Sequence, residues 1–419
     1  MRSKFLKNIL KVIYKMKFLF KIALSLCLLL VLDVDLAVAE DESVEAILKK
    51  FKLMQNTFKD SDVDVNEVQK SDLTRDKIQD FIDSAKDSNQ PINIVESLGS
   101  NLSGLNLSGM DFSNTIMYHV NFYGANLDDC IFTNAFLEGV NFENASLQRS
   151  IFVNANISRA NLTKANLTNS KLSKTYAENS MFMATNFENA KIFASNFSNS
   201  NFNNSNLDKS KIVKSKFSYS SFQDVKITGV YWDLNFFSSS NFSNVNIVNS
   251  NLKAIDWGNS KFKGVVFQDC IIFASNFQNS DLTDVVFDKI NAKAINFSEA
   301  KLSKVIINRS DMSYAFFQDG MISEFIVMLS YFDSSNFRRV NLMNANFSSS
   351  NLKNSTFYQA ILNKSEILNS YLAGINFSKS NLIDMSINDS NLSYANFRSA
   401  KIDNFSSRNN LIEKVFINE

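Results

Sequence analysis

A large apolar residue returns at every fifth position of this chain, from Leu102 to Ile417, with no insertion or deletion in between. The series has 64 positions, and only Ala177, Ala292 and Ser407 hold something other than Leu, Ile, Val, Met, Phe or Trp. A spacing of five matches neither an amphipathic helix, which repeats every 3.6 residues, nor a strand, which alternates every two. It predicts a repetitive architecture in which each five-residue unit forms one short segment followed by a corner.

Two more positions of the unit are restricted. The residue two before the large one is usually small, as at Ala125, Ala145, Ser200 and Ser220, and the residue just before it is most often Asn. The unit (A/S/V)-N-(L/F)-x-x resembles the pentapeptide-repeat family over residues 101–419, with more Phe and Ser than is usual there. The resemblance implies an all-β solenoid, a right-handed quadrilateral β-helix with four units in each coil of 20 residues.

The sequence supports the 20-residue period independently. One of the four columns of large residues is aromatic on eleven successive coils, whereas the other three mix Leu, Ile and Phe. Because protein interiors are close-packed, we expect these rings to form core rather than a ligand-binding strip. With coils about 4.8 Å apart, 16 coils would span roughly 77 Å. The aromatic column consists of Phe197, Phe217, Phe237, Trp257, Phe277, Phe297, Phe317, Phe337, Phe357, Phe377 and Phe397.

Residues 1–39 have the pattern of a secretory signal peptide. Lysines precede an apolar run over residues 22–32, and Ala37-Val38-Ala39 is typical of a cleavage site; Met1 and Met16 are both candidate starts. The run is shorter than the roughly 20 residues that span a bilayer. We therefore expect cleavage and export, to the periplasm or beyond it. The alternative is a membrane anchor formed by residues 22–32, which would be the chain's contact with a membrane.

Both ends of the repeat have a different pattern. Within residues 40–95, apolar residues spaced three and four apart predict helices near 44–58 and 73–85, and Pro91 separates them from the repeat. We interpret residues 40–95 as a helical cap on the first coil or as a docking segment. The repeat domain covers residues 96–404, and residues 405–419 are expected to form a C-terminal cap or a last imperfect coil. Relatives in the family pair end to end, so the resemblance also implies a homodimer through a rod end as one option.

Side chains with catalytic chemistry are sparse. The sole histidine, His119, falls at an outward position, and Cys130 and Cys270 fall at the small inward position. The two cysteines are seven coils apart, about 34 Å, which is too far for a disulfide. No Cys/His metal cluster, Gly-rich phosphate loop or hydrolase motif appears. We expect no enzymatic activity, no cofactor and no metal.

The charge of the repeat region limits its partners. Residues 101–419 carry 26 acidic and 28 basic residues, a net charge of +2. Some pentapeptide-repeat proteins mimic DNA and engage type II topoisomerases, but that role needs a strongly acidic rod. The sequence also lacks a basic groove with interleaved aromatic residues, which argues against binding nucleic acid. An unidentified protein is the expected partner.

Two columns of outward positions depart from the usual Asn and Ser. The first is apolar and predicts a partner contact, unless its side chains are covered at a corner. It consists of Val266, Val286, Ile306 and Ile326, with Met328 and Leu329 beside them. The second is basic and predicts either contact with an acidic polymer or lipid headgroup, or a charged wall that resists sideways aggregation. It consists of Lys171, Lys191 and Lys211, with Lys174 and Lys214 nearby.

Together these observations predict a non-enzymatic exported protein that acts as a scaffold or protein-binding rod in the bacterial envelope. A secreted effector that acts on a host cell or a competitor is the alternative, with the helical segment as its docking element. Adhesion to envelope polysaccharide is a third option. A repeat fold does not by itself select among them.

Overall fold

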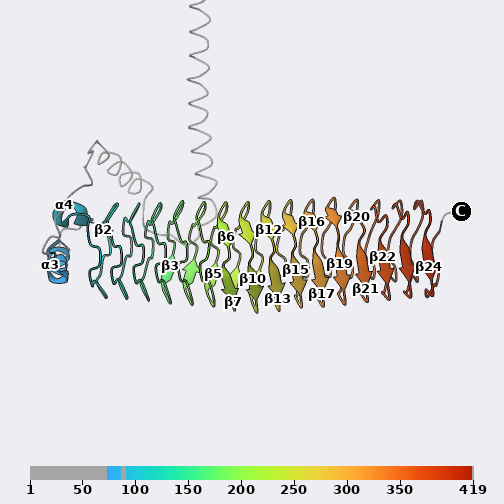
Figure 1. Ribbon diagram of the computed structural model, residues 1–419, viewed down its shortest axis with the longest axis horizontal. Coiled ribbons are helices and arrows are strands. Elements are labelled where there is room, and N and C mark those ends of the chain that lie inside the picture. Colours follow the sequence, from blue (N-terminus) through green and yellow to red (C-terminus); the bar gives the residue numbers. More distant parts are fainter. Residues whose placement is uncertain (1–72, 86–90, 418–419) are drawn as a thin grey trace, which may run out of the picture. The chain divides into compact units, whose positions relative to one another are not determined.

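The computed structural model describes residues 73–85 and 91–417. The expected signal peptide of residues 1–39 and the expected helix near residues 44–58 lie outside these ranges. The described chain forms a parallel β-solenoid of about 16 turns (Figure 1), as the sequence predicted.

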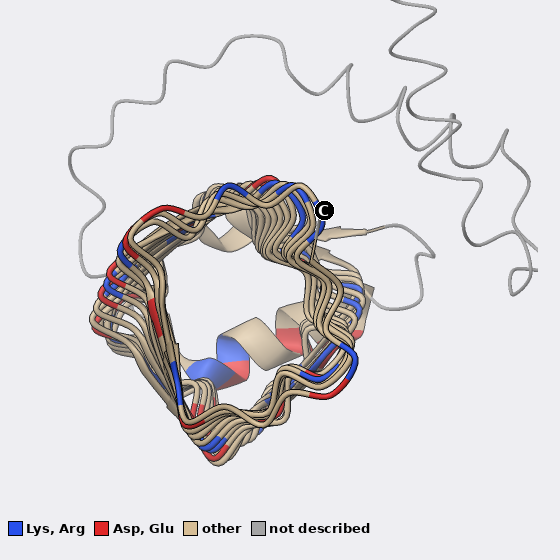
Figure 2. Cartoon of the chain, turned by 90° about the vertical axis from the view of Figure 1, so that its right-hand side faces the viewer, with Lys and Arg blue, Asp and Glu red and all other residues tan. Residues whose placement is uncertain are grey.

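Each coil contains 20 residues, because strand positions pair with the residues 20 further along the chain. Parallel bridges run from Asn101↔Asn121 near one end to Asn396↔Phe416 at the other. Seen along the axis, the coils superimpose as one four-sided tube (Figure 2). We number its sides by their inward columns, which begin at Leu102 for wall 1, Leu107 for wall 2, Phe112 for wall 3 and Met117 for wall 4. Each coil forms backbone hydrogen bonds only with the coil before it and the coil after it, so the rod is a linear stack of units.

Three of the walls carry sheets of five or more short parallel strands. Wall 1 contains β6 (Ser221–Gln223), β9 (Asn241–Ser243), β12 (Lys261–Lys263), β14 (Asp281–Thr283), β16 (Lys301–Ser303), β18 (Met321–Ser323) and β20 (Asn341–Met343). Wall 2 contains β7 (Lys226–Thr228), β10 (Asn246–Val248), β13 (Val266–Gln268), β15 (Val286–Asp288), β17 (Ile306–Asn308), β19 (Ile326–Met328), β21 (Asn346–Ser348), β22 (Glu366–Leu368), β23 (Ser386–Asn388) and β24 (Ser406–Arg408). Wall 3 contains β3 (Lys171–Ser173), β4 (Lys191–Phe193), β5 (Lys211–Val213), β8 (Tyr231–Asp233) and β11 (Asn251–Lys253).

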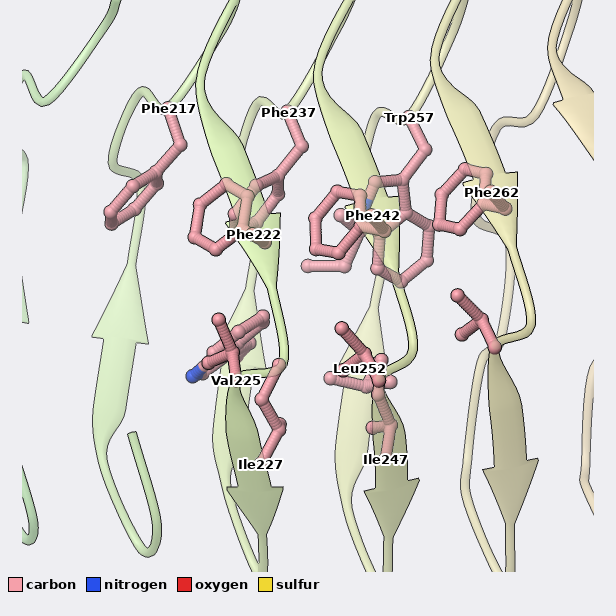
Figure 3. Packing of buried hydrophobic residues seen from close by; sticks show 14 of the residues in the cluster. Phe217, Phe222, Val225, Ile227, Phe237, Phe242, Ile247, Leu252, Trp257 and Phe262 are labelled. Atoms are coloured by element: carbon pink, nitrogen blue, oxygen red, sulfur yellow. The ribbon is translucent and has the colours of Figure 1, made fainter. Parts of the chain in front are cut away.

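The large residues of all four columns point into the tube and form a continuous core (Figure 3). On wall 4, the ring of Phe217 stacks between Phe197 and Phe237, with centroids 5.0 and 4.9 Å away. Phe202 on wall 1 meets the Phe217 ring edge-on at 5.5 Å. The aromatic column is therefore core, as predicted, and its spacing follows from the distance between strands.

The buried serines do more than fill small positions, which is the role that the sequence alone suggests for them. The N–H of Ser200 donates to Oγ of Ser220, 3.0 Å away on the next coil. Oγ of Ser220 in turn donates to the carbonyl of Phe197 at 3.1 Å. Each such serine satisfies a buried backbone donor and a buried backbone acceptor, which would be expensive to leave unpaired.

Every corner of the tube requires a left-handed backbone. Each fifth residue from Gly99 to Lys414 has a positive φ, and 56 of these 64 residues are not glycine. None of them is Val, Ile or Thr, since a β-branched side chain fits this conformation poorly. Asn is frequent there because it tolerates the left-handed region.

The N-terminal end of the tube is covered by helical structure. Helix α3 (Arg75–Ala85) buries Ile78 and Ile82, which belong to the same core cluster as the coils. Strand β1 (Ile92–Asn93) pairs with β2 (Thr115–Ile116), and the short helix α4 (Ile94–Leu98) follows, capped by the Asn93 side chain. Strand β1 thereby pairs with part of the backbone edge that the first coil would otherwise expose.

The last described coil continues the ladder, because β24 pairs with β23 and Asn396 pairs with Phe416. Its inward side chains are exposed, however: Ile402 by 45%, Ile412 by 61% and Ile417 by 67%. Among the described residues, nothing covers this end as α3 covers the other.

Candidate interaction surfaces

The apolar ladder predicted from the sequence forms one continuous row on wall 2. Strand pairing places Val266, Val286, Ile306 and Ile326 side by side on four successive coils. The first three side chains are half-buried, whereas Ile326 is exposed. Each residue of the row is the first of its strand and none occupies a left-handed corner. The accessible part of the ladder is its C-terminal end, because only Ile326 is exposed.

Two neighbours extend that accessible end. Met328 is half-buried beside Ile326, and Leu329 is 55% exposed at the following corner. Leu329 has a φ of 50°, a conformation in which a bulky residue is unusual. A large apolar side chain in this strained and exposed place is more consistent with a contact than with packing.

The predicted basic patch is equally continuous and lies on wall 3. Lys171, Lys191 and Lys211 are register neighbours, and all three are exposed. Lys174 and Lys214 occupy the adjoining corners of the first and third of these coils. The basic patch thus brings five ammonium groups together over three coils.

Elsewhere the rod pairs opposite charges between coils. Arg149 donates to Asp129 at 2.7 Å, which lowers the pKa of that carboxyl group, and Arg339 and Asp319 repeat the arrangement. All seven ion pairs between two described residues of the coils join neighbouring coils in this way. None of them involves a lysine of the basic patch, so like charges are stacked there without a neutralising carboxylate.

Wall 3 also carries an aromatic surface that the sequence interpretation missed. Outside the last coil, 22 large apolar side chains of the described residues are exposed, and nine of them lie on this wall. They are spread over three outward columns, so no single column appears apolar in the sequence. The nine are Phe193, Tyr231, Leu234, Ile271, Phe273, Tyr314, Tyr331, Tyr371 and Tyr394.

A shallow groove of about 410 Å³ lies at the corner between walls 2 and 3. Ile271 and Tyr331 lie at its two ends, three coils apart, and Lys289 and Arg309 line its other side. Cys270 lies at its base, where burial raises the pKa of the thiol to about 11. The groove offers mixed polar and apolar contacts but no nucleophile that would ionise near neutral pH.

The remaining reactive side chains are isolated. Cys130 and Cys270 are both buried free thiols, and burial raises the pKa of Cys130 to about 12. His119 occupies an exposed corner with a φ of 57° and is directed toward Gly139 of the next coil.

Residues 73–85 and 91–417 contain no group of three His, Cys, Asp or Glu residues that could hold a metal ion. No helix within those ranges is long and apolar enough to cross a bilayer.

Family models for pentapeptide repeats match most of the coils. The model described as a pentapeptide repeat region matches residues 125–195. The model of pentapeptide repeats in eight copies matches residues 99–134, 190–229, 275–313, 330–363 and 369–405. The chain belongs to the pentapeptide repeat family. The repeat folds of this family are non-enzymatic.

Solved pentapeptide repeat proteins are similar to this one in fold only. HetL of Nostoc sp. PCC 7120, described as involved in regulating heterocyst differentiation, is 18% identical; the match covers 57% of this chain and 92% of HetL, with a TM-score of 0.26. QnrB1, a plasmid-mediated fluoroquinolone resistance protein, is 15% identical; the match covers 47% of this chain and 91% of QnrB1, with a TM-score of 0.35. No curated protein matches this pentapeptide repeat protein.

Proposed function

We propose that this pentapeptide repeat protein is a non-enzymatic, exported rod that binds a protein partner in the bacterial envelope. The signal pattern of residues 1–39 supports export. The absence of a metal cluster among the described residues, and the inert state of both buried thiols, support binding rather than catalysis.

The observation that carries the proposal is the apolar ladder on wall 2. Its rigid strands hold Ile306 and Ile326 in register, so a partner would meet a preformed surface at little cost in conformational entropy. Leu329 adds an exposed apolar side chain at the adjoining corner. Together they form an apolar centre with polar surroundings, because Asn246 and Asn346 occupy the same column on the flanking coils.

A double substitution tests this contact. We expect Ile306→Asp with Ile326→Asp to weaken capture of the partner from periplasmic extract by on the order of 30-fold, because two apolar side chains at the centre of the contact are replaced by charges. The measurement is quantitative mass spectrometry of proteins retained by immobilised wild type and variant.

The matched control is Asn246→Asp with Asn346→Asp, which adds the same charge to the same column just beyond the ladder. It should retain the partner at the wild-type level. If the isoleucine variant has an unchanged circular dichroism spectrum and recovers the same proteins as the wild type, the ladder is not the contact.

A secreted effector is the second candidate, favoured by the separate pattern of residues 40–95 next to an export signal. In that case the protein would leave the cell and act on a host or a competitor. Fractionation of a tagged strain distinguishes the two roles, since an effector appears in the medium whereas an envelope rod stays with the periplasm. Material found only in the periplasm would exclude the effector.

Self-association through the rod end is also part of the proposal. The exposed Ile412 and Ile417 of the last described coil offer an apolar surface beside an unpaired backbone edge. We expect sedimentation of the wild-type chain to give a dimer, and Ile412→Asp to give a monomer. Sedimentation of both proteins as monomers would contradict a dimer through this end.

A further inference from the structure

Wall 3 combines its nine exposed apolar side chains with a distinctly basic charge. Between Lys171 and Tyr394, its outward positions hold eight lysines and three aspartates, a net charge of +5. The outward positions of wall 2 over the same coils hold four basic and six acidic residues. The lysines of wall 3 are Lys171, Lys174, Lys191, Lys211, Lys214, Lys253, Lys293 and Lys353, and the aspartates are Asp233, Asp311 and Asp333.

The lysines and the apolar side chains are interleaved. Exposed Phe193 lies in the outward column between the column of Lys171 and the column of Lys174. In the column of Lys171, Tyr231 follows Lys211 on the next coil. The ammonium group of Lys211 lies 5.4 Å from the centre of the Tyr231 ring. Lysine stems and tyrosine rings are both amphipathic, with an apolar body and a polar tip.

Two features of this wall oppose stability and so call for another explanation. The lysine ladder stacks like charges on adjacent strands, which is destabilising. Leu234, Tyr314 and Tyr394 are bulky residues at left-handed corners, with φ of 54°, 63° and 62°, and all three are exposed. Strain and repulsion retained at a surface are typical of functional contacts.

The distribution of these groups indicates the shape of the partner. They extend over 12 coils, or about 53 Å, and across all three outward columns of a straight wall. A small ligand would use one short stretch, and a linear polymer would follow one column. A broad, flat and negatively charged partner with an apolar layer beneath its charges fits the whole wall.

We propose that wall 3 binds the surface of a bilayer that contains acidic lipids, with the rod lying flat on it. The lysine ammonium groups would pair with phosphate headgroups. The tyrosines and Phe193 would enter the interfacial layer, where amphipathic rings are favoured. This contact is peripheral and separate from any anchor formed by residues 22–32, and it leaves the apolar ladder on wall 2 free for a protein.

Flotation of the full chain with vesicles tests the proposal. The probes are vesicles of phosphatidylglycerol and phosphatidylcholine in equal amounts, and vesicles of phosphatidylcholine alone. We expect binding to the acidic vesicles, at least a tenfold weaker binding after Lys171→Gln, Lys191→Gln and Lys211→Gln together, and weaker binding at high salt.

Matched variants on other walls show whether vesicle binding depends on wall 3 in particular or on positive charge in general. All variants contain residues 1–39, so any contribution of that segment to binding is the same in each. Lys261→Gln, Lys263→Gln and Lys304→Gln remove three exposed charges from wall 1 and should leave binding unchanged. Tyr331→Ser with Tyr371→Ser on wall 3 should weaken binding several-fold. Tyr176→Ser with Tyr219→Ser on wall 4 should not.

Three outcomes would overturn the proposal. The first is equal binding of the wall 3 and wall 1 lysine variants. The second is equal binding to both kinds of vesicle. The third is full displacement by soluble dextran sulfate together with no effect of the wall 3 tyrosine variant, which would identify a soluble polyanion and not a bilayer as the partner.

Discussion

Replacing Phe217 with alanine is expected to lower the free energy of local unfolding of the rod by about 3–5 kcal/mol. The ring is fully buried and contacts Phe197, Phe237 and Phe202, so its loss leaves a cavity that rigid neighbouring coils cannot fill. Because coils contact only their neighbours, the defect should stay local. Hydrogen–deuterium exchange should accelerate on the order of a hundredfold to several thousandfold around residues 197–237.

The control is Phe217→Leu, since leucine occupies equivalent inward positions such as Leu207. It should lose much less protection, because most of the volume is retained. Exchange over residues 337–397 should be unaffected in both variants. Uniform acceleration along the rod would show that the coils unfold as one cooperative unit, contrary to this expectation.

Asn259→Val is expected to destabilise its coil by about 1–2 kcal/mol through the backbone alone. Asn259 is exposed at a corner with a φ of 59°, and its N–H donates to the carbonyl of Gln278 at 2.9 Å. A β-branched residue would favour a different φ and misdirect that hydrogen bond. Local exchange around residues 257–279 measures the effect.

Asn259→Gly is the matched control, because glycine adopts the same φ without a steric penalty. It should leave exchange near residues 257–279 close to that of the wild type. If valine and glycine give the same result, the corner conformation does not restrict sequence at this position. The absence of Val, Ile and Thr from all 64 corners would then need another cause.

The period of five made most of the fold predictable. A single uninterrupted register assigned Phe217 to the core and Lys211 to the surface, and the aromatic column supported the four units per coil that the family resemblance implied. Whether a side chain points inward or outward depends on its position within one coil. This can be read from the sequence because every coil faces the same environment. The helix at residues 75–85 was likewise indicated by its apolar spacing.

Properties that depend on neighbouring coils were harder to read. The role of Ser220 was missed because its acceptor, the carbonyl of Phe197, lies 23 residues earlier in the chain. The ladder of Val266 and its neighbours was predicted as a row, but its burial depends on flanking side chains. The aromatic surface of wall 3 escaped notice because Tyr231, Leu234 and Phe273 occupy three different columns.

The way each coil bonds only to the next has a mechanical consequence. The hydrogen bonds between coils run along the rod axis, so a pull on the two ends would peel off one coil at a time from an end. Each coil releases 20 residues, about 66–72 Å of extended chain, while the rod shortens by only about 4.8 Å. A rod held at both ends could therefore lengthen many-fold under load and keep its remaining coils intact, which would make it an extensible tether.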